Sequence, residues 1–110
     1  MEELKHAMEL NGANFDEQAG KGVALVDFWA PWCGPCRSMG PVIDELHGEY
    51  DGRALVGKVN VDEADTLAAR FGVMTIPSIF VLKDGEVVQH FVGVQPKENL
   101  KLALNAALEG

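Results

Sequence analysis

The chain has 110 residues, of which 47% are hydrophobic and 24% charged, a composition typical of globular proteins rather than of disordered or membrane proteins. Its net charge of −8, from 17 Asp and Glu against 9 Lys and Arg, disfavours binding to the phosphate backbone of nucleic acids. We see no signal peptide and no transmembrane segment, and two cysteines are too few for a disulfide-built secreted scaffold, so we expect one cytoplasmic domain over residues 1–110 with no membrane partner.

The N-terminal part predicts a short strand followed by a short helix. Residues 4–10 form the predicted strand. Asn14 has a glutamate, Glu17, three positions later, which is the spacing of a capping box at a helix N-terminus. This helix should end at Gly20.

A central strand and a long helix come next. The apolar run Val23–Ala30 lies between Gly22 and Pro31 and is typical of a strand covered on both faces. The helix that follows contains Pro41, which removes a backbone hydrogen bond and should kink it. Apolar residues recur at helical spacing and predict its buried face: Met39, Val42, Ile43, Leu46 and Tyr50.

Residues 55–61 predict the next strand, which makes a right-handed strand–helix–strand unit with parallel strands. Asp62 is positioned to cap a further helix, and Gly72 can end that helix in a left-handed conformation. The predicted inner face of this helix consists of Ala64, Leu67, Ala68 and Phe71.

The C-terminal part predicts a hairpin and a last helix. Residues 78–83 and 87–92 flank the pair Asp84-Gly85, a strong hairpin signal, and Pro96 suits the first turn of a helix. The helix should bury Leu100, Ala103, Leu104, Ala107 and Leu108. The whole order predicts an α/β fold with a mixed sheet of about five strands flanked by four helices.

Two cysteines stand at the junction of the central strand and its helix. Cys33 should lie at the helix N-terminus, where free backbone N–H groups and the helix dipole favour a thiolate, while Cys36 lies one turn inside. A thiolate at Cys33 can attack a substrate disulfide, and Cys36 can then resolve the mixed disulfide. The pattern therefore favours Cys33 and Cys36 as a redox-active pair of catalytic cysteines.

Three other interpretations of the cysteines remain open. A zinc site needs four ligands, but the only histidines are His6, His47 and His90, none at ligand spacing, so we expect no metal. A static disulfide over so short a loop would constrain the unfolded chain little. The two thiols could also be inert core residues.

The segment Val26–Cys36, VDFWAPWCGPC, resembles the active-site segment of the thioredoxin family. The resemblance covers nearly the whole chain and continues through Arg37, Pro41, Lys58, Ile76-Pro77, Lys83-Asp84-Gly85 and Gly93. It implies the thioredoxin fold and a thiol–disulfide oxidoreductase that reduces protein disulfides, with the Cys33–Cys36 disulfide and no bound cofactor. It further implies a monomer that receives electrons from NADPH through thioredoxin reductase. The implied substrates are oxidised proteins such as ribonucleotide reductase, peroxiredoxins or methionine sulfoxide reductases.

Asp27 lies in the middle of the apolar central strand, where burial should raise its pKa. A capped or paired aspartate is the alternative. The resemblance implies a buried acid that moves protons to and from Cys36. Lys58, in the following strand, would modulate Asp27, and an ordinary lysine whose stem lies along the sheet is an equal alternative.

The resemblance also implies a substrate-docking surface around Cys33. The Ile76–Pro77 bond would be cis, and the Ile76 backbone would pair with substrate backbone as an added strand. Trp32 could instead be scattered apolar surface, and Gly93 a turn or bulge. Trp29 and Pro41 are expected to be structural. The full predicted surface is Trp32, Gly34, Pro35, Ile76, Pro77, Gly93 and Val94.

Some positions depart from the common pattern of the family. Met74-Thr75 stands where Arg-Gly is frequent, which removes a positive charge near the docking surface. Ser78 stands where threonine is usual, and Gly20-Lys21-Gly22 stands where a proline is common. Two rival functions are open: an oxidase or isomerase of the same fold, disfavoured because no histidine lies between the cysteines, and a binding subunit that does not use its cysteines.

Overall fold

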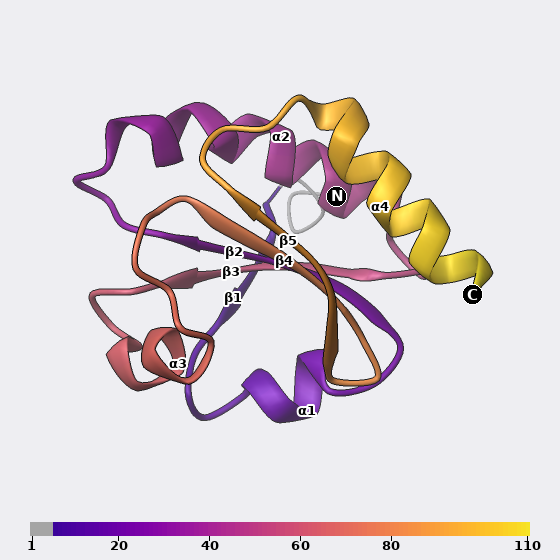
Figure 1. The fold of residues 1–110 in the computed structure, drawn as a ribbon, viewed down its shortest axis with the longest axis horizontal. Helices are drawn as coiled ribbons and strands as arrows, with labels where there is room; N and C mark the ends of the chain where they lie inside the picture. The colour runs from indigo at the N-terminus through magenta and orange to yellow at the C-terminus, as the bar shows by residue number, and fades with distance from the viewer. Residues whose placement is uncertain (1–5) are drawn as a thin grey trace.

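The computed structural model describes residues 6–110 and contains one mixed sheet of five strands (Figure 1). The strand order is β1-β3-β2-β4-β5, in which β1, β3 and β2 are parallel and β4 and β5 run antiparallel to their neighbours. The strands are β1 (Met8–Leu10), β2 (Val23–Trp29), β3 (Leu55–Asn60), β4 (Ser78–Lys83) and β5 (Glu86–Val92). The predicted mixed sheet is confirmed, and the first two residues of the predicted strand 4–10 lie outside the described part of the chain.

Four helices cover the two faces of this sheet, α2 and α4 on one face and α1 and α3 on the other (Figure 1). They are α1 (Phe15–Ala19), α2 (Gly34–Glu49), α3 (Asp65–Arg70) and α4 (Lys97–Glu109). Because both faces are covered, every residue of β2 from Val23 to Phe28 is buried, as its apolar run predicted. No helix within residues 6–110 is long and apolar enough to cross a membrane.

Each face of the sheet has its own core. The core under α2 and α4 is mainly aliphatic and includes Leu25, Ile43 and Leu104. The core under α1 and α3 also contains a cluster of four phenylalanine rings, with neighbouring ring centroids 5.3 to 5.6 Å apart. Such tilted and edge-to-face pairs are favourable beyond the area that they bury. The aromatic residues are Phe15, Phe28, Phe71 and Phe80.

The predicted capping box at the N-terminus of α1 is wrong, because the side chains of Asn14 and Glu17 do not form its hydrogen bonds. Asn14 is the N-cap residue, but its side chain makes no capping bond to the helix, and no hydrogen bond joins it to Glu17 among the described residues. Its Oδ1 atom instead accepts from the backbone N of Asn11 at 2.8 Å, and its Nδ2 atom donates to the carbonyl of Glu9 at 3.1 Å. The asparagine therefore ties the helix to the end of β1.

The predicted starts of the later helices also need correction. Asp62 does not cap α3, which begins three residues later at Asp65. Pro96 immediately precedes α4 rather than lying in its first turn. Gly72, with a φ of 66°, ends α3 in the left-handed conformation as predicted.

The turn between β4 and β5 is the predicted tight hairpin. Asp84 and Gly85 both have positive φ, 52° and 87°, as a type I′ turn requires. Asp84 also accepts from the backbone N of Gly22 at 2.9 Å, which fixes the start of β2 against the hairpin.

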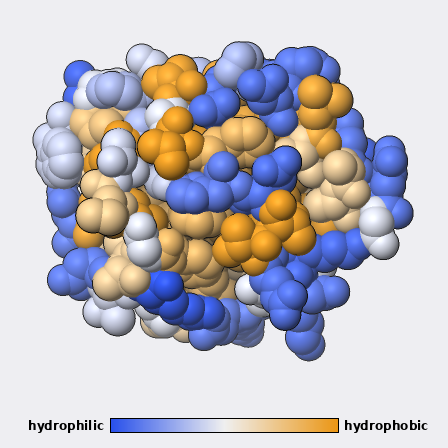
Figure 2. All heavy atoms as spheres, in the orientation of Figure 1, coloured by the Kyte–Doolittle hydropathy of each residue, from blue (hydrophilic) through white to orange (hydrophobic). Residues whose placement is uncertain are grey.

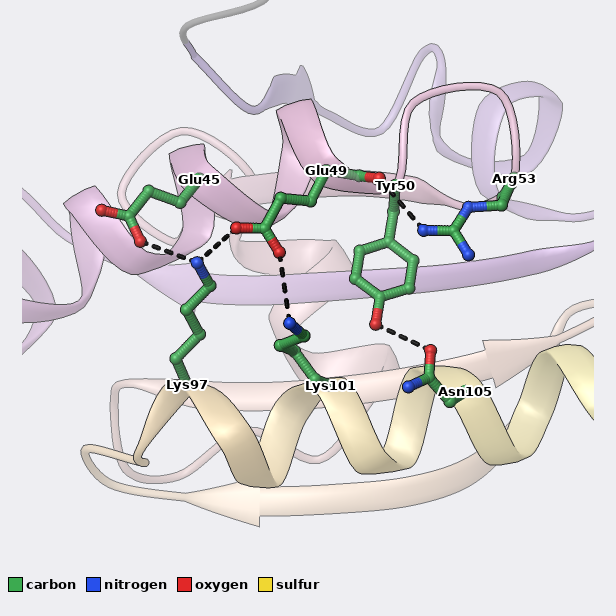
Figure 3. A network of polar contacts seen from close by, with 7 residues as sticks. All are labelled: Glu45, Glu49, Tyr50, Arg53, Lys97, Lys101 and Asn105. Atoms are coloured by element: carbon green, nitrogen blue, oxygen red, sulfur yellow. Dashed lines mark hydrogen bonds and ion pairs between the residues drawn. The ribbon is translucent and has the colours of Figure 1, made fainter.

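A polar network joins α2 to α4 (Figure 3). The Nζ atom of Lys97 donates to Glu45 at 3.0 Å and also to Glu49, and the hydroxyl of Tyr50 donates to Asn105 at 2.7 Å. The hydrogen bond with Lys97 lowers the pKa of Glu49, and the same bond raises the pKa of Lys97. These contacts attach the C-terminal half of α2, the helix whose N-terminus follows Cys33, to α4.

Candidate active site

Cys33 and Cys36 form a disulfide at the N-terminus of α2, with Cα atoms 5.3 Å apart. Cys33 is the extended N-cap residue, so its side chain points across the first turn of the helix. Gly34 and Pro35 form that turn, where a proline costs no hydrogen bond because the first backbone N–H groups have no partner in the helix. The spacing of the two cysteines thus brings their sulfurs together.

The two sulfur atoms are not equivalent. The backbone N of Cys36 donates to Sγ of Cys33 at 3.2 Å, a bond that, with the helix dipole, would favour a thiolate at Cys33 in the reduced protein. Cys33 is 6% exposed and Cys36 only 2%. Cys33 is therefore the more exposed of the two residues, and its sulfur accepts a backbone hydrogen bond.

A second segment faces the cysteines from the sheet side. The Ile76–Pro77 peptide bond is cis, and the carbonyl oxygen of Ile76 lies 3.9 Å from Sγ of Cys33. The backbone N of Gly93 donates to the carbonyl of Pro77 at 2.8 Å, and Gly93 has a φ of 89° that favours glycine. The β2–α2 connection, the segment before β4 and the β5–α4 connection thus meet at one end of the sheet, on the left in Figure 1.

Asp27 is a buried carboxylate beneath this site. It lies on the same face of β2 as Trp29, which packs against the cysteine pair. Its Oδ1 atom has no hydrogen-bond partner in the described part of the chain. Burial raises its pKa to about 7, and the positive charge of Lys58 opposes that rise.

Lys58 is the register partner of Asp27 on β3. No ion pair joins the two among residues 6–110. The Nζ atom of Lys58 lies instead 4.9 Å from the centre of the Trp29 ring. Lys58 thus acts on Asp27 through its charge, and Trp29 helps to hold it.

A shallow hollow lies beside the cysteines. Trp32, 66% exposed, forms one wall, and its indole N–H donates to the carboxylate of Asp62 at 3.0 and 3.2 Å. The hollow has a volume of about 170 Å³ and an apolar lining: Trp32, Val61, Ala68, Val73, Met74 and Ile76.

The structure brings most predicted site residues to one end of the sheet. Val94 follows Gly93 there and is exposed. Pro41 lies further along α2, away from the sulfurs, and the helix continues past it to Glu49. Exposed apolar side chains occur elsewhere in small groups separated by hydrophilic ones, as one face shows (Figure 2).

Sequence reasoning missed part of this surface. Asp62 was assigned to a helix cap, and its bond to Trp32 has no local signal because the two residues are 30 positions apart. Met74 was named from the sequence only because it stands where the family often has a positively charged arginine, and its place in the lining of the hollow was not predicted. No three His, Cys, Asp or Glu side chains within residues 6–110 gather as metal ligands.

Comparisons with known proteins agree with this geometry. The family model described as thioredoxin matches residues 6–106. Thioredoxin of Staphylococcus haemolyticus is 52% identical over 101 residues, which cover 92% of this chain and 97% of the relative. Thioredoxin of Staphylococcus saprophyticus is 54% identical over 93 residues, or 84% of this chain and 89% of that one. A solved structure of a mutant thioredoxin from Halobacterium salinarum is 33% identical with a TM-score of 0.87, and the match covers 96% of this chain and 94% of that chain.

Proposed function

Because this chain belongs to the thioredoxin family and is a disulfide reductase with a redox-active Cys33–Cys36 disulfide, we propose the following roles for its residues in reducing oxidised proteins. The observation that carries the proposal is the bond from the backbone N of Cys36 to Sγ of Cys33. It supports Cys33 as the nucleophile of the pair and Cys36 as the resolving residue.

In the first step, the Cys33 thiolate attacks one sulfur of a substrate disulfide. A bond forms between Cys33 and that sulfur, the substrate disulfide breaks, and the other substrate sulfur leaves as a thiolate. The greater exposure of Cys33 and its place at the N-terminus of α2 support this assignment.

In the second step, Cys36 loses its proton and attacks Sγ of Cys33 in the mixed disulfide. The Cys33–Cys36 bond forms and the second substrate sulfur leaves, so the substrate gains two electrons and the chain becomes oxidised. Asp27 takes the proton of Cys36, and Lys58 modulates that transfer. A buried carboxylate with a pKa of about 7 supports this role, because it can accept and return a proton near neutral pH.

Substrate docks on the surface around Cys33. The Ile76 backbone beside Sγ of Cys33 pairs with substrate backbone as an added strand, while the exposed Trp32 and Val94 contact substrate side chains. Gly34, Pro35, Pro77 and Gly93 complete this surface, and Trp29 and Pro41 are structural.

The partners of this family are, in general, a thioredoxin reductase and substrate proteins. For this chain we propose electrons from NADPH through that reductase. The proposed substrates are of the ribonucleotide reductase, peroxiredoxin or methionine sulfoxide reductase type. The protein would act as a single domain and a monomer in the cytoplasm.

The test is a pair of cysteine variants with a disulfide-bonded protein, insulin, as substrate. Cys36→Ser should accumulate a covalent adduct through Cys33, visible by mass spectrometry, because the resolving thiol is gone. Cys33→Ser should form no adduct and reduce no insulin. Adducts at Cys36 in the Cys33→Ser variant, and none at Cys33 in the Cys36→Ser variant, would reverse the two roles.

The reduction potential separates the reductase from an oxidase of the same fold. Equilibrium titration against thiol–disulfide buffers should place Cys33–Cys36 near the roughly −270 mV known for thioredoxin itself. A value near the roughly −120 mV of the oxidant DsbA would mean that electrons flow the other way.

A further inference from the structure

Met74 is the most exposed large apolar side chain in the described part of the chain, at 95%. It lines the hollow beside Cys33 together with Trp32 and Ile76. Ile76 itself packs against the cysteine pair. A polarisable thioether thus lies in open solvent on the surface where substrates are proposed to dock.

The other described methionines are better protected. Met39 is 1% exposed, and its sulfur accepts from the backbone N of Gln95 at 3.5 Å. Met8 is half-buried on β1 and lines a separate hollow with Lys21 and Arg53. An oxidant in solution therefore reaches the sulfur of Met74 before those of Met8 and Met39.

We propose that Met74 is a modification site: hydroperoxides oxidise its thioether to the sulfoxide, and the sulfoxide weakens docking of protein disulfides beside Cys33. The inference rests on the proposed docking surface and adds a regulation of it. It assigns a role to the residue that stands where the family frequently has arginine.

The chemistry balances with one hydroperoxide for each Met74. A lone pair on the sulfur attacks the outer peroxide oxygen, an S–O bond forms and the O–O bond breaks. The sulfur is oxidised by two electrons, and the peroxide is reduced to water or an alcohol. Methionine sulfoxide reductases reverse this modification.

The surroundings of Met74 explain why the sulfoxide should matter. A sulfoxide oxygen is a strong hydrogen-bond acceptor, and a docked substrate would remove its water. Four of the remaining lining side chains, Val61, Ala68, Val73 and Ile76, carry no donor. The one side-chain donor in the lining, the indole N–H of Trp32, already donates to Asp62. The buried oxygen would stay unpaired, which disfavours docking.

The experiment treats the full chain, in its Cys33–Cys36 disulfide form, with hydrogen peroxide. The disulfide keeps the thiolates from being oxidised first. Peptide mass spectrometry follows the addition of one oxygen to each methionine. The peroxide is then removed, and dithiothreitol serves as the reductant for two substrates, insulin and the small hydroxyethyl disulfide. Each protein is compared with its own untreated sample.

Two matched variants complete the design. Met74→Leu keeps an apolar side chain and removes the oxidisable sulfur, while Met8→Leu does the same away from the hollow. We expect Met74 to oxidise before Met8 and Met39. The rate with insulin should fall about fivefold or more on treatment of wild type and Met8→Leu, but not of Met74→Leu. The rate with hydroxyethyl disulfide should not change, and methionine sulfoxide reductase should restore the insulin rate.

Three results would overturn the inference: Met74 oxidised no faster than Met39, an equal loss in Met74→Leu, or an equal loss with the small disulfide. The last would place the damage in the cysteine chemistry rather than in docking. Failure of the proposed function looks different, because the untreated wild type would then not reduce insulin at all.

Discussion

The indole N–H of Trp32 donates to both carboxylate oxygens of Asp62, at 3.0 and 3.2 Å. The two residues lie on different connections, one before α2 and the other after β3. Trp32 is largely exposed, so packing alone does not fix the orientation of its ring. The hydrogen bond to Asp62 therefore helps to fix the indole as a wall of the hollow beside Cys33.

Replacing Asp62 should make the orientation of the Trp32 indole less ordered without changing the cysteine pair. In Asp62→Ala, we expect the KM for insulin reduction to rise about threefold, because the freed indole must be ordered when substrate docks. The rate with hydroxyethyl disulfide should not change. Glu63→Ala removes a carboxylate from the adjacent residue and serves as the control. An unchanged KM in Asp62→Ala would show that the bond does not contribute to docking.

Asp27 should make the protein less stable as the pH rises. Its pKa is about 7 in the folded chain, against an ordinary value of 3.8 for an exposed aspartate. Below pH 4 both the folded and unfolded states hold the proton. Between pH 4 and 7 only the unfolded state loses it, so unfolding becomes more favourable as pH rises, and above pH 7 the effect is constant.

Asp27→Asn should remove this dependence. At about 1.4 kcal/mol per pH unit, the interval between the two pKa values corresponds to a gain in unfolding free energy of the order of 4 kcal/mol at pH 8. The gain should vanish near pH 3. Denaturant unfolding of both proteins across this range measures it. A difference in stability that does not vary with pH would mean that the two states share one pKa.

The same variant tests the proton transfer. An ionised Asp27 is needed to accept the proton of Cys36, so release of the mixed disulfide by the wild type should slow as pH falls through about 7. In Asp27→Asn the release should be slower, with a changed pH profile. Stopped-flow measurement of product release gives the profile, and an unchanged one would remove Asp27 from the mechanism.

The fold was largely predictable because its signals are local. The apolar run of β2, the Asp84-Gly85 turn and the left-handed Gly72 each depend on a few neighbouring residues. The helix starts were less predictable. A side chain such as Asn14 or Asp62 can cap a helix or bond elsewhere, and only the tertiary structure decides between the two.

The cysteine pair was predictable because its two residues, in the first turn of one helix, lie close in sequence as well as in space. The docking hollow depends instead on contacts between distant segments. Trp32 and Met74 line it together although they are 42 positions apart, and the bond from Trp32 to Asp62 spans 30. No local pattern marks such contacts.

Lys97 is the centre of the network between α2 and α4 and should contribute modestly to stability (Figure 3). Lys97→Met keeps the apolar stem and leaves Glu45 and Glu49 without this partner. We expect Tm to fall by less than about 5 °C at low ionic strength, and by less in high salt, because exposed ion pairs are screened. Lys101→Met, whose Nζ lies 3.6 Å from Glu49, is the matched control and should have a smaller effect. A fall in Tm that salt does not reduce would point to lost packing instead.

His90 connects the end of β5 to the residue that follows Pro77. Its ring stacks on Phe80 with centroids 4.0 Å apart and planes at 8°, and its Nε2 atom lies 2.6 Å from Oγ of Ser78. His90 is exposed, and neither contact was predicted from the sequence. Since Ser78 is buried, loss of its partner would leave a hydroxyl without a hydrogen bond beside the docking segment.

His90→Ala should therefore lower the free energy of unfolding by about 1–2 kcal/mol, through loss of both the stack and the hydrogen bond. His90→Phe keeps an aromatic ring on Phe80 and should recover only the stacking part. In a double-mutant cycle with Ser78→Ala, we expect a coupling of about 1 kcal/mol between the two side chains, measured by denaturant unfolding. Gln89→Ala, on the adjacent residue of β5, controls for loss of side-chain packing on this edge strand. Strictly additive effects of His90→Ala and Ser78→Ala would mean that the 2.6 Å contact contributes nothing to stability.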